Sequence, residues 1–424
     1  MGRTTSILLA LVAGLISGIA LRVFIGHDTA VAGFLQPVGE LWLNALRMTL
    51  VPLVFCLMTA GVASLADTAA GSGKQVGIAV AVFLTLLVAA SVVGAGTAEA
   101  LMTVWPVKPI DVALAAHSAA GTATPPNFVS VLVGLIPLNP VAAAAEAAMA
   151  PLIVFAAIFG IAISRLPSAS RRLLVDFFKA SADAMLIIVN WVLSAAPIGI
   201  FILTLEAAAN VGVGLALGLV QYVLLLSTVL AVGLICATLI GLSSGRPTRF
   251  LRAALGPQAL AASTQSSMAC LPSLMQAAET LELPGPFVAT IMPLAVTTFR
   301  FGNVFGGVAA GLIGAHLFGI HPGISLIVLA IAIGVLTNVG VLGLPGQAVL
   351  FAAYGPIFAA LGTPIEALTL LIAVFTLPDI LDTTCNVTAD LAATVLIARL
   401  ARLETERSPR MVKPADVDTN VSGT

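Results

Sequence analysis

Long apolar runs constrain this chain more than any other feature. The clearest covers residues 212–242, which contain no Asp, Glu, Lys or Arg. A helix needs about 20 apolar residues to cross the hydrocarbon core of a bilayer, so this run is long enough to span a membrane. Similar runs occupy the rest of the first half of the chain, at 5–24, 37–65, 75–104, 127–163 and 176–208. The sequence therefore predicts an all-α protein that crosses the membrane several times.

The composition supports this interpretation and excludes other classes. Hydrophobic residues make up 59% of the 424 residues and charged residues 9%, against roughly a quarter charged in soluble domains. Because 18 basic residues nearly balance 19 acidic ones, no net field attracts a nucleic acid. No Ser/His/Asp grouping, metal cluster or cofactor loop is visible in the sequence, so neither an enzyme nor a bound cofactor is expected.

Basic residues predict the orientation in the membrane. They fall in alternate connections between the apolar runs, at Lys74, Arg165, Arg171, Arg172, Arg246, Arg249, Arg252, Arg399 and Arg402. Arg22 and Lys108 are nearly alone on the opposite side. Since cytoplasmic loops carry an excess of Lys and Arg, both termini are predicted to be cytoplasmic, in an inner membrane. The charged tail, residues 403–424, is predicted to be disordered.

Four segments interrupt the apolar sequence of the second half, at 263–272, 297–303, 338–346 and 379–390. Broken helices at membrane depth are tolerated only where the freed backbone faces protein or a wet cavity. The first and third segments are predicted to be the tips of two hairpins that enter and leave the same side of the membrane. Such tips offer backbone N–H groups and hydroxyls to an anion.

The fourth segment places three carboxylates in membrane-spanning sequence. As a helix it forms one polar stripe, made by Asp379, Asp382, Thr383, Asn386 and Asp390. Each buried charge costs a few kcal/mol or more unless it is paired, solvated or protonated. Arg300 is the only basic residue deep in this half, so it is the predicted partner of Asp390 or Asp382. It is either a structural counter-ion between two helices or a member of a transport site.

Several motifs together resemble the dicarboxylate/amino acid:cation symporter family, which includes glutamate and neutral amino-acid transporters. The resemblance covers residues 44–402 and rests on the segments 47–55, 136–140, 151–155, 159–162, 196–201, 343–346 and 386–390. It implies eight transmembrane helices, two re-entrant hairpins, a homotrimer and an elevator mechanism.

The resemblance also implies two domains. Residues 1–74 and 127–243 would form mainly a scaffold that holds the trimer together. Residues 75–126 and 246–402 would form mainly a mobile transport domain. That domain would contain a first hairpin at about 248–283, an interrupted seventh helix at 286–318, a second hairpin at 323–361 and an eighth helix at 365–400.

The resemblance assigns roles to particular residues. Ser266 and Ser267 match the first hairpin tip, whose backbone and hydroxyls hold the substrate carboxylate. Asn386 matches the asparagine that binds the main-chain carboxylate, and Asp390 matches a sodium ligand. The second tip is matched by Gly343, Leu344, Pro345 and Gly346.

Departures from the family pattern are equally informative. Residues 299–303 read Phe-Arg-Phe-Gly-Asn where the family has Asn-Met-Asp-Gly-Thr, so aromatic rings replace two oxygen ligands. This argues against sodium coupling and suggests that Arg300, beside Asn303, acts as a tethered cation that neutralises Asp390. In the first tip, Met268, Ala269 and Cys270 stand where the family usually has Ser, Gly and Thr.

The eighth helix departs as well, and its register has two solutions. A gapless alignment places Asp379 at the family's amine-binding aspartate, whereas a short deletion places Asp382 there. In both, the arginine that pairs with an acidic substrate's side chain is missing. A neutral or cationic amino acid is therefore plausible, unless Arg300 takes over the anion and restores dicarboxylate binding.

These observations predict a secondary active transporter for a small amino acid or dicarboxylate. Coupling to protons through Asp382 or Asp390 is an alternative, because burial raises the pKa of a carboxylate. Uncoupled exchange, and a substrate-sensing protein that has lost transport, are the remaining alternatives.

Overall fold

The computed structural model describes residues 3–24, 30–71, 73–110, 133–146, 148–243, 245–340, 347–363 and 365–401, and within these ranges it contains helices and no strand. In the first half the helices are α1 (Arg3–Phe24), α2 (Ala30–Gly71), α3 (Gly73–Val104), α5 (Pro140–Ala145), α6 (Met149–Ser164), α7 (Ser168–Ser194) and α8 (Ala196–Val211). The second half contains α9 (Val213–Leu242), α10 (Pro247–Thr264), the short 3-10 helix η2 (Met268–Cys270), α11 (Leu271–Thr280), α12 (Gly285–Thr298), α13 (Phe301–Leu317), α14 (Ile324–Gly340), α15 (Gln347–Ala360), α16 (Ile365–Val374) and α17 (Thr376–Leu400).

Several of these helices are long and apolar enough to cross a membrane. Five spans qualify among the described residues, and a sixth does if the bent pair α7 and α8 is taken as one span. Shorter apolar helices occur at Leu9–Phe24, Met149–Ser164 and Ile324–Asn338. The predicted all-helical, multi-pass membrane protein is thus confirmed at this level of detail.

The predicted apolar run at 176–208 is interrupted. The axes of α7 and α8 meet at an angle of 58°, and α8 begins at Ala196 with a proline near its start. Pro197 has no backbone N–H and its ring clashes with the preceding helical turn, so it fits the start of a helix and kinks or breaks one that runs through it. The bend is therefore encoded locally.

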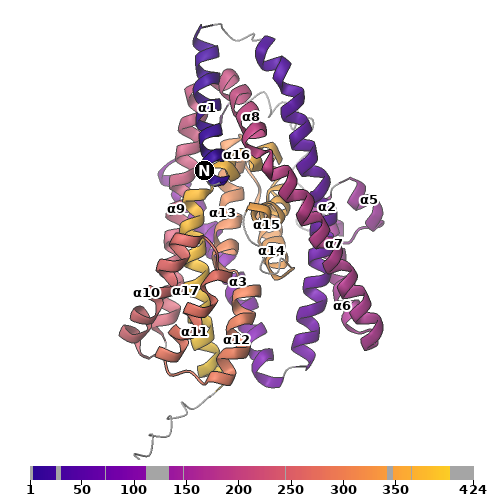
Figure 1. The fold of residues 1–424 in the computed structure, drawn as a ribbon, viewed down its shortest axis with the longest axis vertical. Coiled ribbons are helices and arrows are strands. Elements are labelled where there is room, and N and C mark those ends of the chain that lie inside the picture. The colour runs from indigo at the N-terminus through magenta and orange to yellow at the C-terminus, as the bar shows by residue number, and fades with distance from the viewer. Residues whose placement is uncertain are drawn as a thin grey trace, which may run out of the picture.

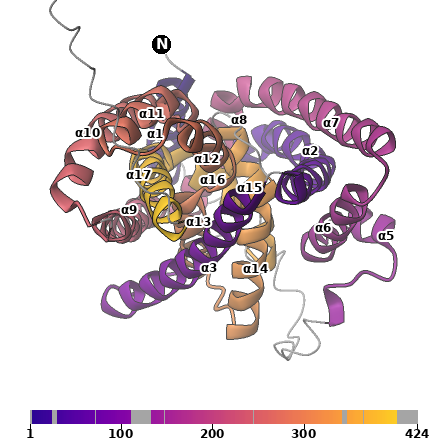
Figure 2. The ribbon, with the colours of Figure 1, turned by 90° about the horizontal axis from the view of Figure 1, so that it is seen from below.

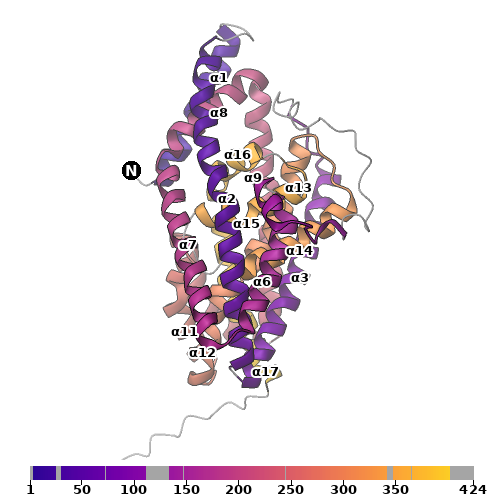
Figure 3. The same cartoon turned by 90° about the vertical axis from the view of Figure 1, so that its right-hand side faces the viewer.

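Many of the helices fall into two groups by their packing, and Figure 2 shows α2, α6 and α7 of one group on the opposite side of the view from α9, α10 and α17 of the other. In one group, α2 packs against α6, α7 and α8, and α1 packs along α8; Figure 3 shows α2 and α7 running along the same side of the molecule. In the other group, α17 packs along α9 and is flanked by α10, α12 and α13, while α3 packs along α13 (Figure 1).

Helix α9 packs mainly against helices of the second half. Within residues 127–243, which were expected to belong mainly to a scaffold, α9 contacts α17 and α13 more extensively than it contacts α8. Gly233 of α9 allows this approach, because a Cβ there would lie 3.0 Å from the ring of Phe305 on α13. By its packing, α9 belongs with the helices of the second half.

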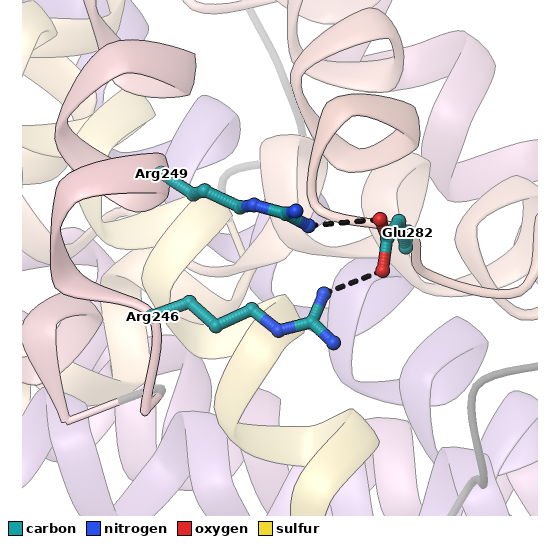
Figure 4. Close-up of polar contacts among 3 residues, drawn as sticks. All are labelled: Arg246, Arg249 and Glu282. Atoms are coloured by element: carbon teal, nitrogen blue, oxygen red, sulfur yellow. Dashed lines mark hydrogen bonds and ion pairs between the residues drawn. The ribbon is translucent and has the colours of Figure 1, made fainter.

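Helices α10 and α11 form a helical hairpin in the region expected for the first tip. Arg246 and Arg249, at the start of α10, form ion pairs of 2.6 and 2.8 Å with Glu282, which follows α11 (Figure 4). These contacts hold the two ends of the hairpin together, and the hydrogen bond from Arg246, followed by that from Arg249, lowers the pKa of Glu282. At the other end, Gln265 adopts a left-handed conformation with φ of 51° and reverses the chain.

Candidate functional site

The candidate site is built around a break between α12 and α13. Phe299 and Arg300 leave the helical conformation there, with φ and ψ of −100° and 78° and of −93° and 70°. Gly302 follows the break and faces α17 so closely that a Cβ would lie 2.4 Å from Oδ1 of Asp382 and 2.5 Å from its backbone oxygen. Only glycine fits at position 302, because any side chain there would collide with Asp382.

The side-chain amide of Asn386 joins α13 to α17. Its Oδ1 accepts a hydrogen bond of 2.8 Å from the backbone N–H of Gly302, and its Nδ2 donates one of 2.7 Å to Oδ1 of Asn303. A longer contact of 3.5 Å joins the same Nδ2 to Oδ1 of Asp382. All of these side chains are buried. Asn386 therefore uses both of its amide hydrogens inside the protein in this conformation.

Four ionisable side chains, Arg300, Asp379, Asp382 and Asp390, lie near one another in this region. Arg300, Asp382 and Asp390 are 8%, 2% and 1% exposed, and the carboxylates of Asp379, Asp382 and Asp390 lie close enough to interact electrostatically with Arg300. Arg300 forms no ion pair within 4.0 Å with any described residue. Its Nε and the Oδ1 of Asp390 are buried without a hydrogen-bond partner among the described residues. Arg300 thus lies near the carboxylates, without direct pairing in this conformation.

The first hairpin contacts α17 through two glutamines. Gln265 donates a hydrogen bond of 2.9 Å to the backbone oxygen of Thr376, and Gln258 donates one of 3.0 Å to Oγ1 of Thr388. Ser266 caps the turn, since its Oγ accepts a bond of 3.4 Å from the N–H of Ala269. The sequence analysis did not select either glutamine, although two amide side chains in a hairpin predicted to enter the membrane were a usable signal.

Phe299 and Phe301 stand where the family has oxygen ligands. Their rings pack against other aromatic rings. The ring of Phe299 stacks on Phe83 of α3, with centroids 4.8 Å apart. Phe301 contacts both Phe299 and Phe305, with centroid separations of 5.9 Å. An aromatic cluster therefore occupies the place where the family resemblance implies oxygen ligands.

The remaining predicted residues lie as follows. Ser267 is buried at the tip, and Thr383 donates a 3.5 Å contact to Oδ1 of Asp379 one turn away on α17. Gly343, Pro345 and Gly346 lie outside the described residues, as does the tail at 403–424. Within the described part, no group of three or more His, Cys, Asp or Glu side chains is arranged to hold a metal ion.

Comparison with known families agrees with this geometry. The model of the sodium:dicarboxylate symporter family matches residues 4–400. The chain belongs to this family. The match includes every helix that contributes to the candidate site.

Similar members of the family transport amino acids. A proton/glutamate-aspartate symporter of Escherichia coli is 26% identical over 414 residues, covering 93% of this chain and 91% of the relative. A proton/sodium-glutamate symport protein of Bacillus caldotenax is 26% identical over 401 residues, covering 91% and 92%. The neutral amino acid transporter B(0) of Bos taurus is 29% identical over 387 residues, covering 83% and 71%.

Proposed function

We propose that this member of the symporter family is a secondary transporter that carries a small amino acid across the membrane. The observation that carries the proposal is the cluster formed by buried Arg300, Asp382 and Asp390 with half-buried Asp379, in which Asp382 contacts the amide of Asn386. Ionisable groups inside membrane helices are expensive and mark substrate or ion pathways. The named relatives move glutamate, aspartate or neutral amino acids, which supports an amino acid as the cargo.

The charges of the cluster favour a substrate that brings an ammonium group. Three carboxylates face one guanidinium, so the ionised cluster has a net negative charge. An ammonium near Asp382, or near Asp379 in the other register, reduces this imbalance, whereas a second substrate carboxylate increases it. Asn386 donates its amide hydrogens to Asn303 and Asp382, so they are not available to the substrate. The substrate carboxylate is therefore bound by Ser266, Ser267 and Arg300. A neutral or cationic amino acid is therefore preferred over a dicarboxylate.

Arg300 takes the role of a coupling cation in this proposal. A sodium ion needs several oxygen ligands to replace its hydration shell, and Phe299 and Phe301 supply none. The guanidinium is instead tethered to the chain and lies near Asp382 and Asp390. Transport of this kind is expected to proceed without a sodium gradient.

Uptake by purified protein in vesicles tests the proposal. Radiolabelled serine, lysine and glutamate are compared with and without an inward sodium gradient, and we expect serine or lysine uptake that is unchanged by sodium. Arg300→Met, which restores the family residue, should abolish this uptake or make it depend on sodium. Arg252→Met, at an exposed position of α10, is the matched control. Steep sodium dependence of the unaltered protein would contradict the role given to Arg300.

Proton coupling is the second candidate, and it is favoured by the Oδ1 of Asp390, which has no hydrogen-bond partner among the residues that the structure describes. A proton bound there adds a positive charge to the cluster and gives this carboxyl group a donor. Uptake driven by a pH gradient alone, and lost in Asp390→Asn, would support this coupling. Ligand-dependent thermal stabilisation without any uptake would instead indicate a substrate sensor.

The finer architecture also belongs to the proposal: eight transmembrane helices, two re-entrant hairpins, cytoplasmic termini in an inner membrane, and a homotrimer that works as an elevator. The break between α12 and α13 and the α10–α11 hairpin support it. The packing of α9 against α17 leads us to place α9 in the mobile domain. Light scattering of the purified protein tests the trimer, and accessibility of cysteines introduced at each terminus tests the topology.

A further inference from the structure

A groove lies between α9 and the segment that follows α3, well away from the candidate site. Trp105 and Lys108 line it on one side, and Leu217, Val220 and Leu224 of α9 line it on the other, around a volume of about 430 Å³. The groove lies at the level of Leu317, the last residue of α13, because Gly218 of α9 contacts Leu317. Arg300 precedes the opposite end of α13, about 25 Å along the helix axis.

The walls of the groove are fixed by hydrogen bonds. Nε2 of Gln221 donates to the backbone oxygens of Pro106 and Trp105, at 3.0 and 3.4 Å. The N–H of Ile110 donates a 2.7 Å bond to the oxygen of Leu317. Gly218 makes room for Ile110, since a Cβ there would lie 2.7 Å from Cδ1 of Ile110. The segment after α3 is therefore held against α9 and α13.

The two walls differ in chemistry. Leu217, Val220 and Leu224 follow one another along a single face of α9 and are 66%, 56% and 48% exposed, so they present an apolar strip about 10 Å long. Lys108 and Trp105 lie on the opposite wall, and both are exposed. Lys108 forms no ion pair with an acidic residue of the described chain. The groove thus combines a cation and an indole N–H with an adjoining apolar surface.

We propose that this groove binds one phospholipid with an anionic headgroup. The phosphate lies between the ammonium of Lys108 and the indole N–H of Trp105, and one acyl chain lies along Leu217, Val220 and Leu224. The depth is appropriate, because α9 begins at Val213 and the apolar strip occupies the turns just below that end. Tryptophan is enriched at membrane interfaces, and a lysine ammonium forms charge-assisted hydrogen bonds with a phosphate.

Fluorescence quenching tests the lipid directly. The chain has three tryptophans, so the double variant Trp42→Phe/Trp191→Phe keeps Trp105 as its single reporter. We expect phosphatidylglycerol with brominated acyl chains to quench Trp105 at about fivefold lower mole fraction than brominated phosphatidylcholine. Lys108→Gln should remove this preference, and Lys179→Gln, an exposed lysine on α7, should leave it intact. Equal quenching by the two lipids, or a preference that survives Lys108→Gln, would overturn the proposal.

A second measurement avoids changing Trp42, which is buried and donates a hydrogen bond to Val192. In native mass spectrometry after extensive delipidation, the unaltered protein should retain one more phosphatidylglycerol per chain than Lys108→Gln does. Soluble glycerol phosphate should not displace this lipid, because it lacks the acyl chain that the α9 strip holds. Equal retention by both proteins, or displacement by glycerol phosphate, would contradict a phospholipid site. Neither outcome depends on transport activity.

Discussion

The spans α3 and α9 differ from α12–α13 and α17 in both composition and surroundings. In the most apolar windows of α3 and α9, 33% of residues are buried in the protein, whereas the corresponding shares are 72% for α12–α13 and 83% for α17. Helix α9 has no charged residue, while α17 carries Asp379, Asp382 and Asp390. These contrasting helices are neighbours, because α9 packs along α17 and α3 packs along α13. The least apolar spans are thus the most enclosed.

This contrast shows how a membrane protein accommodates a charged site. A charge that faces acyl chains has no partner, whereas inside the protein it meets hydrogen-bond donors and opposite charges. The apolar outer helices shield the inner ones from lipid and leave their polar faces directed at each other. The predictions below test whether inner positions are as sensitive, and outer positions as tolerant, as this difference implies.

The largest effect is expected at the buried guanidinium. Arg300→Met leaves the three carboxylates of α17 without their cation and should lower the free energy of unfolding by about 3 to 5 kcal/mol. Denaturant unfolding in detergent measures this loss. The double variant Arg300→Met/Asp390→Asn should recover part of it, because one of the uncompensated charges is removed as well. An Arg300→Met protein as stable as the original would show that the cluster is not charged as we describe.

Two glycines of α3 allow the inner and outer faces of one helix to be compared. A Cβ on Gly94 would lie 2.1 Å from the backbone oxygen of Phe305, whereas a Cβ on Gly96 has nothing within 4 Å. Gly94→Ala should therefore cost about 1 to 3 kcal/mol by forcing α3 from α13. Gly96→Ala should be neutral or stabilising by about 0.5 to 1 kcal/mol, because alanine favours the helix. Similar melting temperatures for the two variants would break the distinction.

A smaller effect is expected for the hydrogen bond between the first hairpin and α17. Gln258→Leu and Thr388→Val each remove one partner of the 3.0 Å bond. A double-mutant cycle should give a coupling energy of about 0.5 to 1.5 kcal/mol, the usual net value of such a bond. A coupling energy of zero would indicate that the hairpin does not rest on α17 in solution.

The smallest effect is expected at the exposed base of the hairpin. Arg246 and Arg249 lower the pKa of Glu282, so the stability from this carboxylate is present at neutral pH and is lost as pH falls through the lowered pKa. Glu282→Gln should reduce the melting temperature slightly at pH 7, and the two proteins should converge at acidic pH and in high salt. Glu279→Gln, an exposed carboxylate of the same hairpin, should have no effect.

Features with local causes could be predicted from the sequence. The apolar runs predict where the membrane-spanning helices lie. The interruption predicted at 297–303 appears in the structure as the break at Phe299 and Arg300. The polar stripe of α17 is likewise buried from Asp382 to Asp390, while Asp379 is half-buried. The roles of the site residues stay predictions, as does the second tip at 343–346.

Features that depend on distant partners could not be predicted in the same way. No sequence pattern indicates that the amide hydrogens of Asn386 are donated to Asn303 and Asp382. The packing of α9 against α17 was also missed, because an evenly apolar helix carries no marked face. Such a helix satisfies any apolar neighbour equally well.

The sequence by itself determined that this chain is helical, that it lies in a membrane, and that charged residues interrupt its second half. These properties follow from helix hydrogen bonds and from transfer of side chains into lipid, and both act over a few turns of chain. The tertiary structure alone decided which polar groups meet. Residues 300 and 382 are far apart in sequence, and only the packing of α13 against α17 brings a guanidinium and its carboxylates into one enclosed space.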